Sequence, residues 1–373
     1  MTKTKVVHII SGLENGGAEG VLFRLIDSSV NNNELIEHVV VSLSGSGVYG
    51  ARLKDKGIKL YCLNMAKSLS SIYSFYVLMR ILKRENPDVA QTWMYHADLI
   101  GGIAAKLVGI KNVLWNIRHS DLNSKHSSKT TVALAKLSAL LSYFIPRKII
   151  TCAEKAKDVH IALGYKADKF VIINNGYDLS RFRKKLPSKR VFSGPVRIGT
   201  VARFNHQKGH DVLLKAVGEI AKGNSIELVL IGNGMSMKNQ LLRELIPNSL
   251  LGHVECLGPV ENIESVMHTL DIHVLPSIAG EGFPNVVAEA MACGVPCIVT
   301  DVGDSAFIVG QSGWVVQPNS IEQLINALEA AINEIKFEPD SWLKRAALSA
   351  SRIEHNFDLG RMRKLYEKHW FGS

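Results

Sequence analysis

Two carboxylates interrupt an apolar stretch of this sequence in a pattern suited to binding a ligand. Glu281 lies in a loop that follows the apolar residues 272–275, and Glu289 lies among Val, Ala, Met and Cys residues about one helical turn after Pro284. A carboxylate in such surroundings is costly unless another side chain or a ligand satisfies it. Pro284 suits the first position of a helix, and the N–H groups that open a helix attract phosphate. The segment is therefore a candidate phosphate-binding site.

Two cations form a second candidate site. Arg203 and Lys208 follow the strand expected at 196–201, and Lys208 stands where a helix expected over 209–221 begins. The helix macrodipole disfavours a cation at that end, whereas a bound anion would reverse this penalty. The pattern favours an anion held by both side chains, and the alternative is a pair of solvated surface cations.

These segments resemble those of a known family. Residues 281–285 and 289–292, which read Glu-Gly-Phe-Pro-Asn and Glu-Ala-Met-Ala, resemble the E-x7-E signature of retaining glycosyltransferases with the GT-B fold, specifically glycosyltransferase family 4. The resemblance covers almost the whole chain. It implies transfer of a hexose or N-acetylhexosamine from a nucleotide-sugar donor, which we expect to be UDP-linked, with retention of the anomeric configuration.

The resemblance also implies a role for each candidate residue. Glu289 would accept hydrogen bonds from the ribose diol, and Glu281 would contact hydroxyls of the transferred sugar. The candidate acceptor-binding residues are Glu19 and Arg118. The candidate catalytic residues are His119, Glu281, Arg203 and Lys208. The candidate donor-binding residues are Gly16, Gly17, Arg203, Lys208, Gly232, Gly234, Glu281, Gly282, Phe283, Pro284, Asn285, Val286 and Glu289.

Segments that follow other strands resemble further ligand-binding parts of the family. Residues 12–19 contain two adjacent glycines, which permit positive φ and close approach of the backbone to a ligand, although an ordinary strand-to-helix turn would use them too. Residues 231–234 resemble the loop beneath the nucleotide base. His119 matches the family's histidine beside the donor sugar, and Arg118 next to it is a candidate contact for an acceptor phosphate.

Motifs for a metal or a dinucleotide are missing or incomplete. The sequence has no D-x-D triplet, which enzymes that hold a nucleotide sugar through a metal commonly carry. We therefore expect no metal and no other cofactor, with Arg203 and Lys208 neutralising the leaving diphosphate. Residues 45–50 match G-x-G-x-x-G, but they follow the second strand and no acid occurs between Asp55 and Glu85, which argues against an NAD site.

Strand-like and helix-like segments alternate along the chain, as in parallel sheets covered by helices on both faces. Two successive series predict an α/β protein of GT-B type, in which two doubly wound Rossmann-like domains face a cleft. We expect an acceptor-side domain at 1–188 and a nucleotide-sugar-binding domain at 189–354, with a helix in 355–373 crossing back to the first. The expected strands are 6–10, 38–43, 59–63, 89–92, 113–116, 148–152, 170–173, 196–201, 226–231, 254–257, 272–275, 297–300 and 314–316.

Charge is divided unequally along the 373 residues. Residues 1–190 hold 29 Lys and Arg against 14 Asp and Glu, a net charge of +15, whereas 191–373 hold 15 against 20, a net charge of −5. The segment 130–148 joins a largely apolar helix to basic residues, which suits an anionic membrane surface. The alternative is a core helix beside a solvated linker. Nucleic acid is not expected, because no recognised binding motif is present.

Composition and charge together suggest a setting for the reaction. The five cysteines form no C-x-x-C pair, and there is no long apolar run. These features are typical of a reduced cytoplasmic protein. We expect peripheral contact with the inner face of the plasma membrane and a polyprenyl-diphosphate-linked acceptor, as in O-antigen or capsule assembly. The alternatives are a soluble acceptor, a GT-B epimerase or phosphorylase, and a non-catalytic binder of sugar nucleotides or polyanions.

Overall fold

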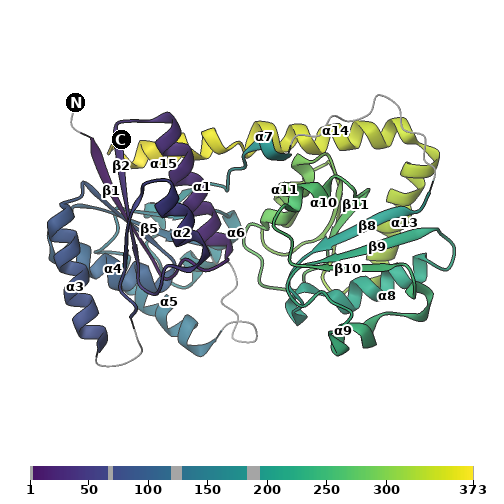
Figure 1. Cartoon of the computed structure of the whole chain (residues 1–373), viewed down its shortest axis with the longest axis horizontal. Helices are drawn as coiled ribbons and strands as arrows, with labels where there is room; N and C mark the ends of the chain where they lie inside the picture. Colours follow the sequence, from purple (N-terminus) through teal and green to yellow (C-terminus); the bar gives the residue numbers. More distant parts are fainter. Residues whose placement is uncertain (1–2, 66–69, 119–127, 183–193, 373) are drawn as a thin grey trace. The chain divides into compact units, whose positions relative to one another are not determined.

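The computed structural model describes residues 3–65, 70–118, 128–182 and 194–372 (Figure 1). The chain divides into two compact units, the first formed by Met1–Gly176 with Leu359–Ser373 and the second by Tyr177–Asp358. The boundary expected between residues 188 and 189 lies outside the described residues. The chain thus passes from the first unit to the second after Gly176 and returns after Asp358.

The first unit contains a parallel sheet, in which the described strands follow the order β3-β2-β1-β4-β5-β6-β7. The order reverses between β1 and β4, which is the point where doubly wound sheets bind their ligands. The strands are β1 (Thr4–Ile10), β2 (Ile36–Ser42), β3 (Lys59–Cys62), β4 (Val89–Trp93), β5 (Asn112–Ile117), β6 (Lys148–Thr151) and β7 (Phe170–Ile172).

Helices cover both faces of this sheet, because successive strand residues point to opposite sides. Val7 and Ile9 of β1 share a core with α3, α4 and α5, whereas Val6 and Ile10 share another with α1, α2 and α15. The helices are α1 (Gly17–Asn32), α2 (Gly47–Asp55), α3 (Ser70–Glu85), α4 (Tyr95–Leu107), α5 (Lys129–Leu141), α6 (Glu154–Ala162) and α15 (Leu359–Trp370), with a 3-10 turn η1 (Ala167–Lys169).

The second unit repeats this architecture around a six-stranded parallel sheet, within the described residues, of order β10-β9-β8-β11-β12-β13. Its strands are β8 (Val196–Val201), β9 (Ile226–Ile231), β10 (Val254–Gly258), β11 (Ile272–Leu275), β12 (Cys297–Thr300) and β13 (Trp314–Val316). Its helices are α7 (Leu179–Phe182), α8 (His210–Ile220), α9 (Gln240–Leu245), α10 (Ile263–Met267), α11 (Asn285–Ala292), α12 (Ser305–Val309), α13 (Ile321–Phe337) and α14 (Pro339–Asn356), with 3-10 turns η2 (His206–Lys208) and η3 (Asn248–Leu250).

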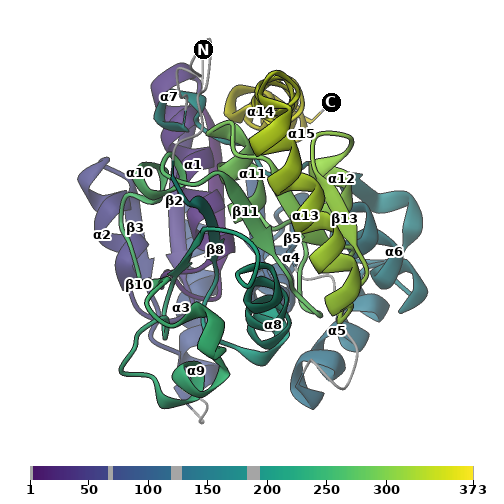
Figure 2. The same ribbon diagram turned by 90° about the vertical axis from the view of Figure 1, so that its right-hand side faces the viewer.

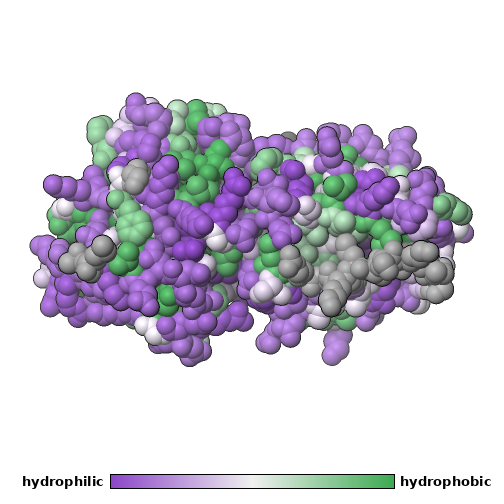
Figure 3. All heavy atoms as spheres, turned by 90° about the horizontal axis from the view of Figure 1, so that it is seen from above, coloured by the Kyte–Doolittle hydropathy of each residue, from purple (hydrophilic) through white to green (hydrophobic). Residues whose placement is uncertain are grey.

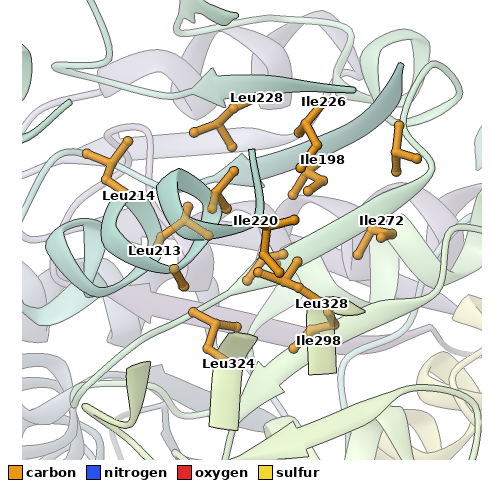
Figure 4. Packing of buried hydrophobic residues seen from close by; sticks show 14 of the residues in the cluster. Ile198, Leu213, Leu214, Ile220, Ile226, Leu228, Ile272, Ile298, Leu324 and Leu328 are labelled. Carbon is orange, nitrogen blue, oxygen red and sulfur yellow. The ribbon is translucent and has the colours of Figure 1, made fainter. Parts of the chain in front are cut away.

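A branched aliphatic core holds the second sheet to its helices (Figure 4). Strand residues such as Ile198 and Leu228 meet Leu213 of α8 and Leu328 of α13. Helices α8 and α13 pack against each other over the sheet (Figure 2). On the face seen in Figure 3, hydrophilic residues cover most of the surface and hydrophobic residues form small groups. The predicted α/β fold with two parallel sheets is confirmed.

The C-terminal helix α15 belongs to the first unit, as the crossing helix of the prediction requires. Met362, Tyr366 and Trp370 recur every four residues, so they lie on one helix face, and all three are buried in the core that contains α1 and α2. The indole N–H of Trp370 donates a hydrogen bond to Gln91 Oε1 of β4 at 2.6 Å. This helix therefore completes the first sheet's covering layer.

Candidate functional site

Lys208 and Glu281, which the sequence placed in separate motifs, bond to each other in the second unit. The Lys208 ammonium donates a hydrogen bond to Glu281 Oε1. The carboxylate is 7% exposed, and the same oxygen accepts a hydrogen bond from Ser277 Oγ at 2.5 Å. Ser277 is in turn held through its carbonyl, which accepts from Thr300 Oγ1 at 2.5 Å. The carboxyl ends of β11 and β12 thus fix one acid and one cation side by side.

Gly209 allows this pairing because of its backbone conformation. Its φ is 64° and its ψ is 32°, which is left-handed and terminates the 3-10 turn that carries Lys208. A Cβ atom at this position would lie 2.1 Å from the carbonyl oxygen of Pro276. Since no side chain fits there, glycine lets the turn before α8 rest directly on the loop that leads to Glu281.

Arg203 lies exposed just beyond the carboxyl end of β8. Its carbonyl oxygen is 3.1 Å from His210 Nε2, and the His210 ring stacks on Phe204 at a centroid distance of 5.7 Å. Burial lowers the pKa of His210, so the neutral ring can donate to that carbonyl. His210 was missed by sequence reasoning, although its place at the first turn of α8, directly after Gly209, was a usable signal.

The glycines that follow β9 bring a second loop against the Arg203 segment. Gly232 has φ of 133°, and a Cβ there would lie 2.2 Å from the carbonyl oxygen of Ala202. Gly234 has φ of 83°, and its Cβ would lie 2.8 Å from Cβ of Phe204. Both positions therefore require glycine for close packing, and the loop predicted to lie beneath a base is adjacent to the predicted phosphate-binding arginine.

The segment from Gly282 to Glu289 leads from the loop after β11 into helix α11. Pro284 is the N-cap, with φ of −70° and ψ of 103°, and Asn285 is the first helical residue. The expectation that Pro284 occupies the first helical position is wrong by one residue, because its ψ is still extended. The Gly282 carbonyl accepts from Asp304 N–H at 2.8 Å. Phe283 is buried, whereas Val286 and Glu289 are half-buried, so Glu289 is less enclosed than the apolar sequence around it suggested.

In the first unit, Gly16 and Gly17 join β1 to α1 without the positive φ that the sequence suggested. Gly16 is the N-cap with φ of −138° and ψ of 169°, which is extended backbone, and Gly17 is not among the glycines with positive φ. A Cβ at Gly16 would instead lie 2.3 Å from Glu19 Oε2. Burial raises the pKa of Glu19, and the charge of Glu14 raises it further.

The G-x-G-x-x-G segment at 45–50 has a packing role. Gly47 has φ of 49°, and a Cβ there would lie 2.2 Å from the carbonyl oxygen of Leu13. The Tyr49 N–H donates to the same carbonyl at 2.9 Å. The segment therefore packs against the glycine-rich loop that follows β1. This packing explains the glycine at position 47 without a bound dinucleotide.

Arg118 makes several contacts at the carboxyl end of β5. Its guanidinium donates to Asn116 Oδ1 at 2.8 Å, to the Tyr366 hydroxyl oxygen at 2.6 Å and to Asn175 Oδ1. It also lies over the Trp93 ring, 5.1 Å from the centroid. These contacts join β5, the segment after β7 and α15. His119, the next residue, lies outside the described residues.

Met94 is a further residue that sequence reasoning missed. It follows β4 with φ of 73° and ψ of 158°, a region that non-glycine residues occupy at a cost of about 1–3 kcal/mol. Its N–H donates to the Asn116 carbonyl at 3.0 Å. Met94 lies beside the reversal of strand order between β1 and β4, where open α/β sheets bind ligands. Nothing in its residue type signals this conformation.

The described residues contain neither a metal-binding cluster nor a membrane-spanning helix. No group of three or more His, Cys, Asp or Glu side chains in that part of the chain is placed to hold a metal ion. None of the described helices combines the length and apolar content needed to cross a bilayer.

Both halves of the chain match glycosyltransferase family models. Residues 15–181 match the model described as Glycosyltransferase Family 4, and residues 195–334 match that of Glycosyl transferases group 1. The putative glycosyltransferase EpsF of Bacillus subtilis is 25% identical over 325 residues, which cover 80% of either chain. An Escherichia coli protein named UDP-Gal:alpha-D-GlcNAc-diphosphoundecaprenol alpha-1,3-galactosyltransferase is 26% identical over 279 residues, 71% of either chain. Other relatives are named for capsular polysaccharide and colanic acid biosynthesis.

Solved structures share the complete architecture. The crystal structure of Anabaena HepE in complex with UDP has a TM-score of 0.84 and 19% sequence identity, and the match covers 99% of this chain and 100% of that one. The fold is therefore GT-B, with two Rossmann-like units. Each half of the chain matches a glycosyltransferase model, and this supports a transferase.

Proposed function

We propose that this chain, with glycosyltransferase domains in both halves, transfers a sugar from a UDP-linked donor to a lipid-linked saccharide with retention of anomeric configuration. The pairing of Lys208 with Glu281 is the observation that carries this proposal. It puts a cation suited to a diphosphate beside an acid suited to sugar hydroxyls. A nucleotide sugar contains a diphosphate and a sugar that are joined to one another.

The second unit supplies the groups needed at the leaving diphosphate. Arg203, Lys208 and the N–H groups of Asn285 and Val286 would neutralise it, in place of a metal. The bond between the sugar's anomeric carbon and the phosphate oxygen breaks, and its electron pair stays on the diphosphate. The acceptor hydroxyl attacks the same face of the resulting oxocarbenium-like sugar, and its proton passes to the leaving phosphate oxygen. His119 is proposed to lie beside the transferred sugar.

Glu281 is proposed to bind the transferred sugar once the diphosphate has engaged Lys208. When a diphosphate draws Lys208 away, the carboxylate keeps the hydrogen bond from Ser277. The freed lone pairs of the oriented carboxylate can then accept from sugar hydroxyls. Glu289, in the second turn of α11, is proposed to accept from the ribose diol, and its half-buried position leaves it accessible.

The proposed acceptor contains a polyprenyl diphosphate, and one surface of the first unit supports this. Leu137 and Leu140 of α5 are exposed and three residues apart, which places them on one helix face, and Phe144 in the turn that follows α5 is exposed as well. Phe144 is 73% exposed. An apolar stripe of this kind suits the boundary between headgroups and acyl chains.

Lysines cluster beside this stripe. The Lys169 ammonium donates to the carbonyl oxygens of Ser142 and Tyr143 at 2.8 Å. Burial lowers the pKa of Lys169, Asp168 raises it, and the charges of Lys106, Lys166 and Lys148 lower it further. The Lys166 ammonium lies 5.5 Å from the Tyr143 ring centroid. Apolar and basic groups on one surface support contact with an anionic membrane. The E. coli relative named for a diphosphoundecaprenol acceptor also supports this choice.

The reaction can be tested with purified protein and a panel of nucleotide sugars. We expect UDP-sugars to raise the melting temperature by mass action, and NMR of the product to report retention at the anomeric carbon. An inverted product would refute the mechanism. UDP binding without transfer or donor hydrolysis would instead favour a non-catalytic sugar-nucleotide binder, and transfer to soluble saccharides alone would favour the alternative acceptor.

A further inference from the structure

Tyr177, the first residue of the second unit, reaches the segment that we propose to bind the diphosphate. Its hydroxyl donates a hydrogen bond to Asn285 Oδ1 at 2.7 Å. Tyr177 is fully buried, and Asn285 is the first residue of α11. The side chain at the entry to the second unit therefore holds the side chain that opens the proposed phosphate-binding helix.

The chain's exit from the second unit contacts the same segment. The Tyr177 N–H donates to the Phe357 carbonyl at 2.9 Å, and Tyr177 and Asp358 form a parallel β-bridge. The Phe357 ring meets Phe283 edge to face, with centroids 5.4 Å apart and an interplanar angle of 68°. Entry and exit are thus bonded to each other, and each contacts one end of the segment 283–285.

We propose that Tyr177 is a positioning residue for the nucleotide diphosphate. By fixing the Asn285 amide, it holds the first turn of α11 in the orientation that presents the N–H groups of Asn285 and Val286. The first N–H groups of a helix have no partner within the helix, and a turn held in a fixed orientation presents them to a ligand in a fixed direction. This inference rests on the proposed function, which supplies the diphosphate.

The contacts also connect the donor segment with the two points where the chain crosses between units. Because coupling free energies are reciprocal, if the Tyr177 and Phe357 contacts strengthen donor binding through the segment 283–285, donor binding strengthens those contacts by the same free energy. Donor binding is therefore expected to restrict the crossing segments, and loosening a crossing segment is expected to weaken donor binding.

Calorimetric titration of the full chain with UDP tests the role of Tyr177. Tyr177→Phe keeps the buried ring and removes the hydrogen bond, and we expect about five-fold weaker UDP binding, the equivalent of one ordinary hydrogen bond. The KM for the donor should rise while the KM for the acceptor stays unchanged. Tyr165→Phe, which removes another buried tyrosine hydroxyl but from the first unit, should leave UDP binding unchanged.

A double-mutant cycle shows whether the effect of Tyr177→Phe acts through Asn285. In the background of Asn285→Ala, Tyr177→Phe should have no further effect on UDP affinity, because its partner is already absent. If Tyr177→Phe does not fold, Phe357→Leu tests the second contact and should also weaken UDP binding. Wild-type affinity in the folded variants overturns the inference and leaves the proposed function standing, whereas a wild-type protein that does not bind UDP overturns both.

Discussion

The hydroxyl oxygen of Tyr366 accepts a hydrogen bond from Arg118 at 2.6 Å, although 248 residues separate the two in the sequence. The same hydroxyl is 2.8 Å from the Asn116 amide nitrogen, and the Tyr366 ring stacks on Trp93. Helix α15 is thereby bonded to the end of β5, the strand that leads directly to His119. The C-terminal helix therefore fixes the carboxyl end of β5 through Asn116 and Arg118.

Tyr366→Phe should destabilise the first unit. The change leaves the buried Asn116 amide and the half-buried Arg118 guanidinium without this acceptor, at a cost of about 1–3 kcal/mol. Urea denaturation followed by circular dichroism measures the loss. Tyr76→Phe, at an exposed position on α3, should change the free energy of unfolding by less than about 0.5 kcal/mol. Equal effects of the two substitutions would contradict the importance of the Arg118 contact.

Lys208→Met should reduce turnover strongly, because the variant lacks a cation at the leaving diphosphate. Removal of one such group lowers kcat by about 10²–10³-fold. Steady-state assays with saturating UDP-sugar give the comparison. Lys215→Met is a suitable control, since Lys215 is an exposed cation on the nearby helix α8. Turnover that survives Lys208→Met would rule out charge neutralisation by this side chain.

Gly209→Ala should disturb the site through the backbone. The added Cβ would collide with the Pro276 carbonyl at a residue with positive φ, and strain of this kind costs about 1–3 kcal/mol. We expect a lower melting temperature and weaker UDP binding, because Lys208 is displaced. Gly223→Ala serves as the control, since no atom lies within 4 Å of its added Cβ. Identical UDP affinities in the two variants would show that Gly209 does not position Lys208.

Acid should destabilise the first unit through two buried histidines. Burial lowers the pKa of His38 from 6.5 to about 4, and it lowers the pKa of His8 well below 6.5, with the charge of His38 contributing. The unfolded chain binds protons below pH 6.5 while the folded chain does not. The contribution of the two neutral histidines to the free energy of unfolding is therefore complete above pH 6.5 and is lost as the pH falls toward 4.

The expected slope is about 1.4 kcal/mol per pH unit for each histidine that titrates only on unfolding. Chemical denaturation at pH 7, 6 and 5 measures it. His8 Nε2 lies 3.0 Å from His38 Nδ1, so His38→Gln should flatten the slope even if it lowers the overall stability. A slope that stays unchanged in this variant would assign the acid sensitivity to other groups.

Leu140→Ser combined with Phe144→Ser should weaken binding to anionic vesicles. The pair removes the most exposed apolar side chains at the C-terminal end of α5, and each buried methylene contributes about 0.8 kcal/mol to membrane partitioning. Sedimentation with vesicles that contain phosphatidylglycerol, at low and high salt, measures the effect. Leu241→Ser, at an exposed leucine of the second unit, should bind like the wild type. If the wild type does not bind at low salt, the membrane contact is wrong.

The fold could be predicted because its signals are local. Each expected strand is present in the described residues, with ends that differ by at most two residues. Strands buried on both faces are short apolar runs, and Gly294, with φ of 72°, follows the end of α11, where glycine is the usual residue. The motif residues of the second unit also lie at the strand ends where the sequence placed them. These features depend on residues a few positions apart.

The pairing within the site could not be predicted, because it depends on partners distant in sequence. Lys208 and Glu281 are 73 residues apart, and the spacing of either motif contains no information about the other. The adjacent glycines at 16 and 17 were expected to permit positive φ, but Gly16 is extended, and a Cβ there would lie 2.3 Å from Glu19 Oε2. Residue type indicated that glycine was required and could not indicate whether a dihedral angle or a neighbouring side chain was the reason.

The first unit is built from two segments that are distant in the chain, and this sets the order in which the two units can fold. Its core needs Met362, Tyr366 and Trp370, which a ribosome adds after every residue of the second unit. The second unit is continuous from Tyr177 to Asp358, so all its residues are available earlier. Domains generally fold as units during synthesis. The N-terminal sheet therefore keeps one face incompletely covered until α15 emerges. A nascent chain gains most from chaperone protection during this interval.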